Sequence, residues 1–145
     1  MDPSRQHTIG KSVTVSGLAL HTGNRVHATI APAPANFGIR FRRIDMPERP
    51  IIRAHASHVI DTRRGTTISE NGGKIHTVEH LLAAFHALQI DNALVDMLGP
   101  EPPILDGSSK PFVEKLLEAG IVDQAEPASY VEVKQPVFLE FGGTK

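Results

Sequence analysis

The chain has 145 residues, of which 40% are hydrophobic and 21% are charged, and its formal net charge is −1. This length is typical of a single domain, and the composition excludes a disordered chain. The sequence contains no cysteine, which excludes a disulfide framework and a thiolate metal site.

No apolar run approaches the roughly 18–20 residues that a membrane-spanning helix needs. The first seven residues lack the apolar core of a signal peptide, so we expect a cytoplasmic protein without a membrane span. Residues 1–64 carry ten Lys or Arg against four Asp or Glu, whereas residues 65–145 carry five against twelve. Nucleic acid is not an expected partner, because nucleic-acid binders are usually basic overall with aromatic residues among the charges.

Strand patterns dominate the first seventy residues. Apolar and polar residues alternate over 13–17 and again over 26–30, and residues 21–24 form a Gly-Asn turn signal between them. We expect a β-hairpin here. Further strands are expected at 39–42 and at 66–68, where an Asn-Gly-Gly turn follows.

The period then changes to that of a helix. Apolar residues recur three and four apart at Val78, Leu81, Leu82, Phe85 and Leu88. Thr77 is the expected N-cap of this helix. Residues 93–98 read as a buried strand, and a second helix is expected over 110–119, ended by Gly120. In the Asp-Gly-Ser turn just before it, Asp106 and Ser108 are expected to accept turn N–H groups and cap that helix.

Residues 123–129 read as a linker, and two further strands are expected at 130–133 and 137–141. Those strands have no partners after them, so the chain is expected to stop inside a second domain. We predict a first domain over 1–126, and a linker with the truncated start of a second domain over 127–145. The expected fold is α+β, a two-layer sandwich with a mostly antiparallel sheet and two helices on one face.

The most distinctive local pattern is the run from His76 to His80, which reads H-x-x-E-H. If the run is helical, two histidines four residues apart share a face and both would reach one zinc ion, while Glu79 would activate a bound water. The same letters occur in the inverted zinc metallopeptidases. On this motif alone, two interpretations stay open: a zinc site of this kind, and a capped helix with two surface histidines.

Five motifs occur in order along the chain: Gly17–Gly23, Pro32–Asn36, Thr77–Ala84, Ile90–Asn92 and Pro103–Ser108. Together they resemble the UDP-3-O-acyl-N-acetylglucosamine deacetylases, the zinc amidases of lipid A biosynthesis, over residues 6–141. The resemblance implies a hydrolase that removes the acetyl group from UDP-3-O-(3-hydroxyacyl)-N-acetylglucosamine, with this chain as its N-terminal half.

The resemblance also implies the roles of single residues. His80 would be a zinc ligand and Glu79 the general base, whereas His76 would be no ligand. The other two zinc ligands, in an H-x-x-x-D pattern, and a further histidine would lie in the missing second domain. No H-x-x-x-D occurs after residue 80, so the chain alone is expected to be inactive.

His21, in the turn of the hairpin, and Thr66 and Thr67, in the segment 61–67, would lie near the substrate. The alternative for each is a purely structural residue of a turn or of a loop leading into a strand, and the same holds for Arg63 and Arg64. The stretches 59–67 and 119–124 look most like family members fused to a 3-hydroxyacyl-[acyl-carrier-protein] dehydratase, so a bifunctional parent is expected.

Two other interpretations remain beside the deacetylase. One is a fragment of an inverted-motif metallopeptidase, which only one of the five motifs supports. The other is a non-catalytic binding or assembly domain. The face that would pack against the second domain would be left apolar, so self-association of the chain is expected in its place.

Overall fold

The computed structural model describes residues 2–140 and 142. The strands are β1 (Arg5–Ile9), β2 (Val13–Leu18), β3 (Arg25–Pro32), β4 (Ile39–Arg43), β5 (Ile51–Arg53), β6 (Val59–Asp61), β7 (Thr67–Glu70), β8 (Gly73–Ile75), β9 (Ala93–Leu98) and β10 (Ile121–Pro127). The helices are α1 (Glu79–Ala87), α2 (Lys110–Ala119) and one 3-10 turn, Ala56–His58.

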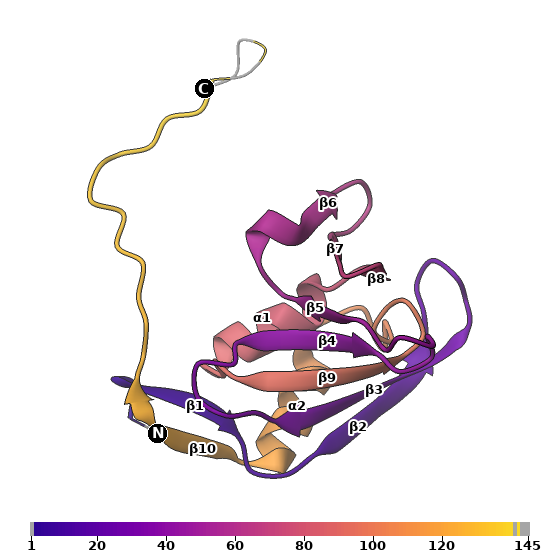
Figure 1. Cartoon of the computed structure of the whole chain (residues 1–145), viewed down its shortest axis with the longest axis horizontal. Coiled ribbons are helices and arrows are strands. Elements are labelled where there is room, and N and C mark those ends of the chain that lie inside the picture. Colours follow the sequence, from indigo (N-terminus) through magenta and orange to yellow (C-terminus); the bar gives the residue numbers. More distant parts are fainter. Residues whose placement is uncertain (1, 141, 143–145) are drawn as a thin grey trace.

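The main sheet has five strands in the order β2-β3-β9-β4-β5 (Figure 1). The predicted hairpin is confirmed, because β2 pairs with β3 antiparallel from Val13 opposite Ile30 to Leu18 opposite Arg25. The predicted buried strand is β9, which lies in the centre of the sheet. The β4–β9 pair is parallel, so the sheet is mixed rather than purely antiparallel.

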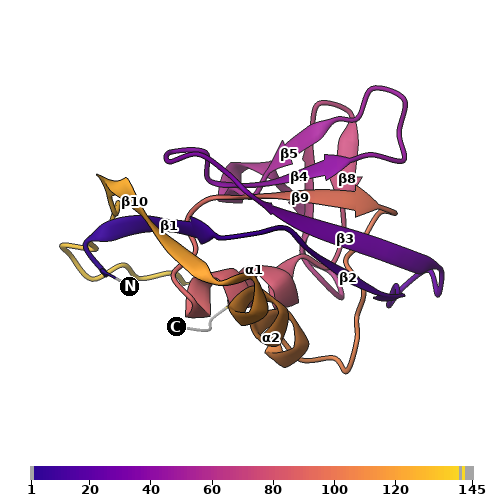
Figure 2. The ribbon, with the colours of Figure 1, turned by 90° about the horizontal axis from the view of Figure 1, so that it is seen from below.

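Both helices lie on the same side of the main sheet (Figure 2). In α1 the side chains of Leu81 and Phe85 are buried, and in α2 those of Phe112 and Leu116 are buried. These residues join the inward-facing side chains of the sheet in one apolar core. The α+β fold with two helices on one face is therefore confirmed. No helix among the described residues is long and apolar enough to cross a membrane.

A second, three-stranded sheet has the order β6-β7-β8 and contains the predicted strand near 66–68. An ion pair joins it to the main sheet. Arg53 of β5 donates from Nη2 to Glu70 Oε1 over 2.6 Å, and its backbone N–H donates to Glu70 Oε2 over 2.9 Å. The hydrogen bonds from Arg53 lower the pKa of Glu70 to about 2.

The prediction of a linker at 123–129 is wrong, because residues 121–127 form β10 and pair antiparallel with β1. The segment has little apolar patterning of its own, and its partner lies more than a hundred residues away in sequence. The predicted strands at 130–133 and 137–141 are not formed in the described residues 129–140, which are exposed. Phe141, the last residue of the second, lies outside the described residues.

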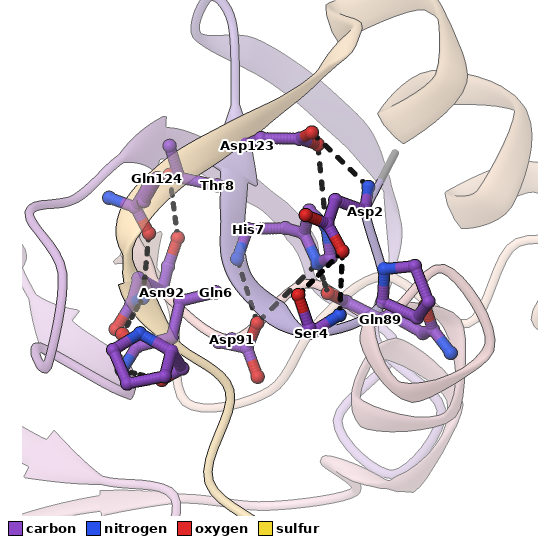
Figure 3. A network of polar contacts seen from close by, with 12 residues as sticks. Asp2, Ser4, Gln6, His7, Thr8, Gln89, Asp91, Asn92, Asp123 and Gln124 are labelled. Atoms are coloured by element: carbon purple, nitrogen blue, oxygen red, sulfur yellow. Dashed lines mark hydrogen bonds and ion pairs between the residues drawn. The ribbon is translucent and has the colours of Figure 1, made fainter.

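The β1–β10 pair is joined to the loop after α1 by His7, whose side chain is 1% exposed (Figure 3). Its backbone N–H donates to Asp91 Oδ2 over 2.7 Å, and its Nδ1 lies 2.9 Å from the carbonyl oxygen of Gln89. Its Nε2 lies 3.4 Å from Asp123 Oδ1 of β10. One buried imidazole thus connects three segments of the chain.

Asn92 lies next to this histidine and is also 1% exposed. Its amide nitrogen donates to Gln6 Oε1 and to Gln124 Oε1, each over 2.8 Å, and its Oδ1 accepts the backbone N–H of Gly38 over 2.8 Å. The carbonyl oxygen of Asn92 accepts the hydroxyl of Thr8. This amide therefore has all of its hydrogen-bonding groups engaged in joining β1 and β10 to the start of β4.

Candidate active site

Glu79 is the first residue of α1, and its carboxylate faces the loop before β7. Oε2 accepts the backbone N–H of Thr66 over 3.1 Å, and the carbonyl oxygen of Thr66 accepts the N–H of Val78 over 3.4 Å. An acidic side chain in the first helical turn also interacts favourably with the helix dipole. The loop and the helix start are thus held together at this carboxylate.

Side chains from two distant parts of the chain, the hairpin turn and the start of α1, meet at Gly65. A Cβ at this glycine would lie 3.3 Å from Glu79 Oε1, 3.4 Å from Thr77 Oγ1 and 3.7 Å from His21 Nε2. Its φ of +149° is also one that residues with side chains rarely adopt. Any other residue would enter the space where these three polar groups converge.

Thr77 is not the N-cap that the sequence pattern predicts. Val78 holds that position, no side chain caps the helix, and Thr77 has a φ of +54° in the left-handed region. This conformation is unfavourable for a β-branched residue, and such strain is concentrated at functional sites. The hydroxyl oxygen is buried with no hydrogen-bond partner among the described residues. The chain turns at Thr77 so that Glu79 starts the helix facing Gly65.

The same turn removes the geometry behind the H-x-x-E-H reading. His76 precedes the helix and His80 lies within it, so the two imidazoles are not four residues apart on one helical face. The Nδ1 of His76 instead lies 3.0 Å from Thr67 Oγ1. Among the described residues, no group of three or more His, Cys, Asp or Glu side chains could hold a metal ion. His76 and His80 therefore do not form the pair on one helical face that the metallopeptidase interpretation requires.

The other predicted site residues lie around this centre. His80 is half-buried beside Glu79, and Thr66 contributes its backbone N–H to the carboxylate. Thr67 is buried, and its hydroxyl contacts His76. His21 is exposed in the hairpin turn, with Nε2 toward Gly65.

The predicted turn functions of Asp106 and Ser108 are confirmed. The backbone N–H of Ser108 donates to Asp106 Oδ1 over 2.9 Å, and the N–H of Lys110 donates to Ser108 Oγ over 3.2 Å. These contacts organise the turn before α2. The N-cap residue of α2 is Ser109, and its side chain makes no capping hydrogen bond.

The loop that carries Gly65 begins with an ion pair. Arg63 Nη2 lies 2.9 Å from Asp61 Oδ2, and the hydrogen bonds from Arg63 hold the pKa of Asp61 well below its usual range. Arg64 follows with a φ of +61°. Both Arg63 and Arg64 are exposed, and Arg63 already has an acidic partner within the loop.

Glu101 is a residue of this region that sequence reasoning missed. Its side chain is 1% exposed, and its Oε1 accepts the backbone N–H groups of Leu20 over 2.5 Å and His21 over 3.2 Å. A signal was present in the sequence. Glu101 is the one charged residue in the proline-rich segment 100–103, directly after a strand that was predicted to be buried.

Comparisons of the sequence with known proteins identify the family of the chain. The sequence model of the UDP-3-O-acyl N-acetylglycosamine deacetylases matches residues 6–144. A bifunctional enzyme LpxC/FabZ of Chlorobaculum tepidum is 47% identical over 91% of this chain and 28% of its own length. The UDP-3-O-acyl-N-acetylglucosamine deacetylases of Citrifermentans bemidjiense and Methylococcus capsulatus are each 44% identical, over 97% and 95% of this chain.

The chain spans less than half the length of these relatives, with 46% of the Citrifermentans protein and 45% of the Methylococcus protein covered. The family match nevertheless covers nearly all of the chain, including Gly65, Glu79, His80 and Glu101. The chain therefore belongs to the UDP-3-O-acyl N-acetylglycosamine deacetylase family.

Proposed function

We propose that this chain is the first half of an enzyme that removes the acetyl group from UDP-3-O-(3-hydroxyacyl)-N-acetylglucosamine, a step of lipid A biosynthesis. The observation that carries the proposal is the placement of the Glu79 carboxylate at the start of α1. There Thr66 binds one oxygen and the site also contains His21. The names of the relatives supply the substrate class.

Glu79 has the geometry of a general base. Its Oε2 is occupied by the N–H of Thr66, whereas Oε1 accepts no hydrogen bond from the residues that the structure describes and faces Gly65. Oε1 would take a proton from the attacking water and return it to the leaving amine, with acetate as the other product. His21, which points to the same place, would contact the substrate, and the Thr66–Thr67 segment would form the wall beside it.

The residues of this chain fit one part of a zinc site, not a complete site. His80 is the ligand that we assign to this chain, and the remaining ligands would come from a second half. When bound, zinc polarises the amide carbonyl and lowers the pKa of its water to about 7. Elemental mass spectrometry tests the assignment. We expect little zinc in the chain alone and no effect of His76→Ala, whereas a full equivalent lost in that variant would contradict it.

The activity test uses what we call the completed enzyme. It consists of this chain followed by the part of the Citrifermentans bemidjiense relative that lies beyond its match. We expect acetate release from the acylated UDP-sugar by the completed enzyme and none by the chain alone. Turnover by the chain alone would show that the half-site proposal is wrong, and an inactive but folded completed enzyme would contradict the deacetylase proposal.

A boundary between two domains near residue 126 is part of this proposal, since β10 ends at Pro127 and the following described residues form no strand. The bifunctional relative supports a parent that also carries a dehydratase. Sequencing the reading frame beyond residue 145 tests both ideas. A stop codon directly after a second deacetylase domain would exclude the fusion.

We further propose that the chain self-associates when it is alone. Apolar side chains in the segment 130–139 are largely exposed, with Val131 at 95% and Phe138 at 89%. Exposed apolar clusters favour association. Sedimentation equilibrium should show a mass that rises with concentration, and a monomer at all concentrations would contradict this.

A cytoplasmic location also belongs to the proposal and is testable by cell fractionation.

A further inference from the structure

The loop after β9 contacts both segments that carry the candidate catalytic side chains. On one side, the carbonyl oxygen of Pro100 accepts the backbone N–H of His76 over 2.8 Å, just before α1. On the other side, Glu101 accepts the N–H groups of Leu20 and His21. The N–H of Ile104 donates to the carbonyl oxygen of Leu18 over 2.9 Å. This short loop thus connects the hairpin turn to the start of the helix.

The loop is rigid and closely packed against β2. Pro100, Pro102 and Pro103 each fix their own φ angle. A Cβ at Gly17 would lie 3.0 Å from the Cβ of Pro103, so the strand and the loop approach as closely as a glycine allows. A side chain carried on such a loop has a defined position relative to β2.

The burial of the Glu101 side chain costs free energy of folding. A buried carboxyl group loses its hydration, and only Oε1 regains hydrogen bonds. Its Oε2 is buried without a hydrogen-bond partner among the described residues. An apolar side chain of similar volume would avoid this loss, and buried charged groups are often worse for stability than apolar replacements. The hydrogen bonds of Oε1 therefore indicate that Glu101 holds the backbone of the hairpin turn in place.

The hydrogen bonds to Glu101 Oε1 fix the position of His21. Two neighbouring N–H groups bound to one oxygen fix the backbone of the hairpin turn at the residue whose Nε2 lies 3.7 Å from the Cβ position at Gly65. Glu79 Oε1 lies 3.3 Å from the same point. We propose that Glu101 is a positioning residue, which holds His21 opposite Glu79 by binding the backbone of its turn. This inference rests on the proposed function, because it assigns a purpose to the His21–Glu79 arrangement.

The first test concerns structure and uses this chain itself. Amide hydrogen exchange should show the N–H groups of Leu20 and His21 protected in the wild type. Protection should be lost in Glu101→Ala and largely kept in Glu101→Gln, whose amide oxygen can still accept both hydrogen bonds. Glu114→Ala, an exposed glutamate of α2, is the matched control. Unprotected amides in the wild type would overturn the proposal whatever the enzyme does.

The second test measures deacetylation by the completed enzyme. Glu101→Ala should lower kcat at least about tenfold, and Glu101→Gln should recover most of it. Combining Glu101→Ala with His21→Ala should be no slower than His21→Ala alone, because a residue that acts through His21 has nothing left to position.

The outcomes of this second test separate the two proposals. Additive losses in the double variant, or an unchanged kcat in Glu101→Ala, would overturn the positioning role while the deacetylase proposal stands. A wild-type completed enzyme that folds but releases no acetate would remove the proposed function, and the positioning role with it.

Discussion

Glu79 Oε2 accepts the backbone N–H of Thr66 over 3.1 Å, which fixes the first side chain of α1 to the loop before β7. Glu79→Gln should keep this hydrogen bond, since an amide oxygen also accepts, but cannot take a proton. We expect kcat of the completed enzyme to fall about 10²–10⁴-fold with an unchanged far-UV circular dichroism spectrum. Glu114→Gln is the control, and near-normal turnover by Glu79→Gln would exclude the general-base role.

Gly65→Ala should damage the site more than the fold. The new Cβ would lie 3.3 Å from Glu79 Oε1, so the carboxylate must shift or the loop must move. Gly72→Ala is a matched control, because Gly72 also has a positive φ, +78°, but has nothing within 4 Å of its Cβ position. Both variants should lose roughly 1 kcal/mol of stability in urea unfolding. Only Gly65→Ala should also lose most of the activity of the completed enzyme.

Asn92→Ala should destabilise the chain by about 3 kcal/mol. The substitution leaves Gln6, Gln124 and the N–H of Gly38 without their shared partner in a buried position, and each unsatisfied buried group costs about 1–3 kcal/mol. Urea unfolding followed by circular dichroism measures the loss. Gln135→Ala, in the exposed segment after β10, should cost nothing measurable. An equal stability of the two variants would show that the amide network contributes little.

The Arg53–Glu70 ion pair should make stability depend on pH in acid. Arg53 lowers the folded-state pKa of Glu70 from 4.5 to about 2. A lowered pKa stabilises the fold above pH 4.5, and that contribution is lost as the pH falls from 4.5 toward 2. Arg53→Met should therefore reduce the acid dependence of the urea midpoint in this window. Arg25→Met, an exposed arginine of β3, should leave it unchanged; identical pH profiles for the wild type and Arg53→Met would contradict the assignment.

Two neighbouring leucines of α2 should respond very differently to truncation. Leu116 is fully buried in the core, whereas Leu117 is 56% exposed. Leu116→Ala should cost about 2–5 kcal/mol through lost burial and a cavity, while Leu117→Ala should lie within about 0.5 kcal/mol of the wild type. Thermal unfolding of both variants provides the measurement. Comparable losses would mean that Leu117 also has an apolar partner in solution.

The local patterns of the sequence determined the elements that later form the core. Alternation predicted the β2–β3 hairpin, an apolar run predicted β9, and helical spacing predicted α1 and α2, because burial of one face imposes those periods. Gly120 ends α2 as expected, with a φ of +76°. Motif order in the sequence also identified the family, which the match over residues 6–144 confirms.

Only the tertiary structure decided the rest, since those features depend on contacts between residues far apart in the chain. β10 becomes a strand because β1 is available to pair with it, although the segment itself reads as a linker. Thr77 leaves its expected capping position because the chain must turn there to bring Glu79 to Gly65. Glu101 meets the turn of His21 across 80 residues of sequence. No local period encodes such a contact, because it is set by how a rigid loop packs against a distant hairpin.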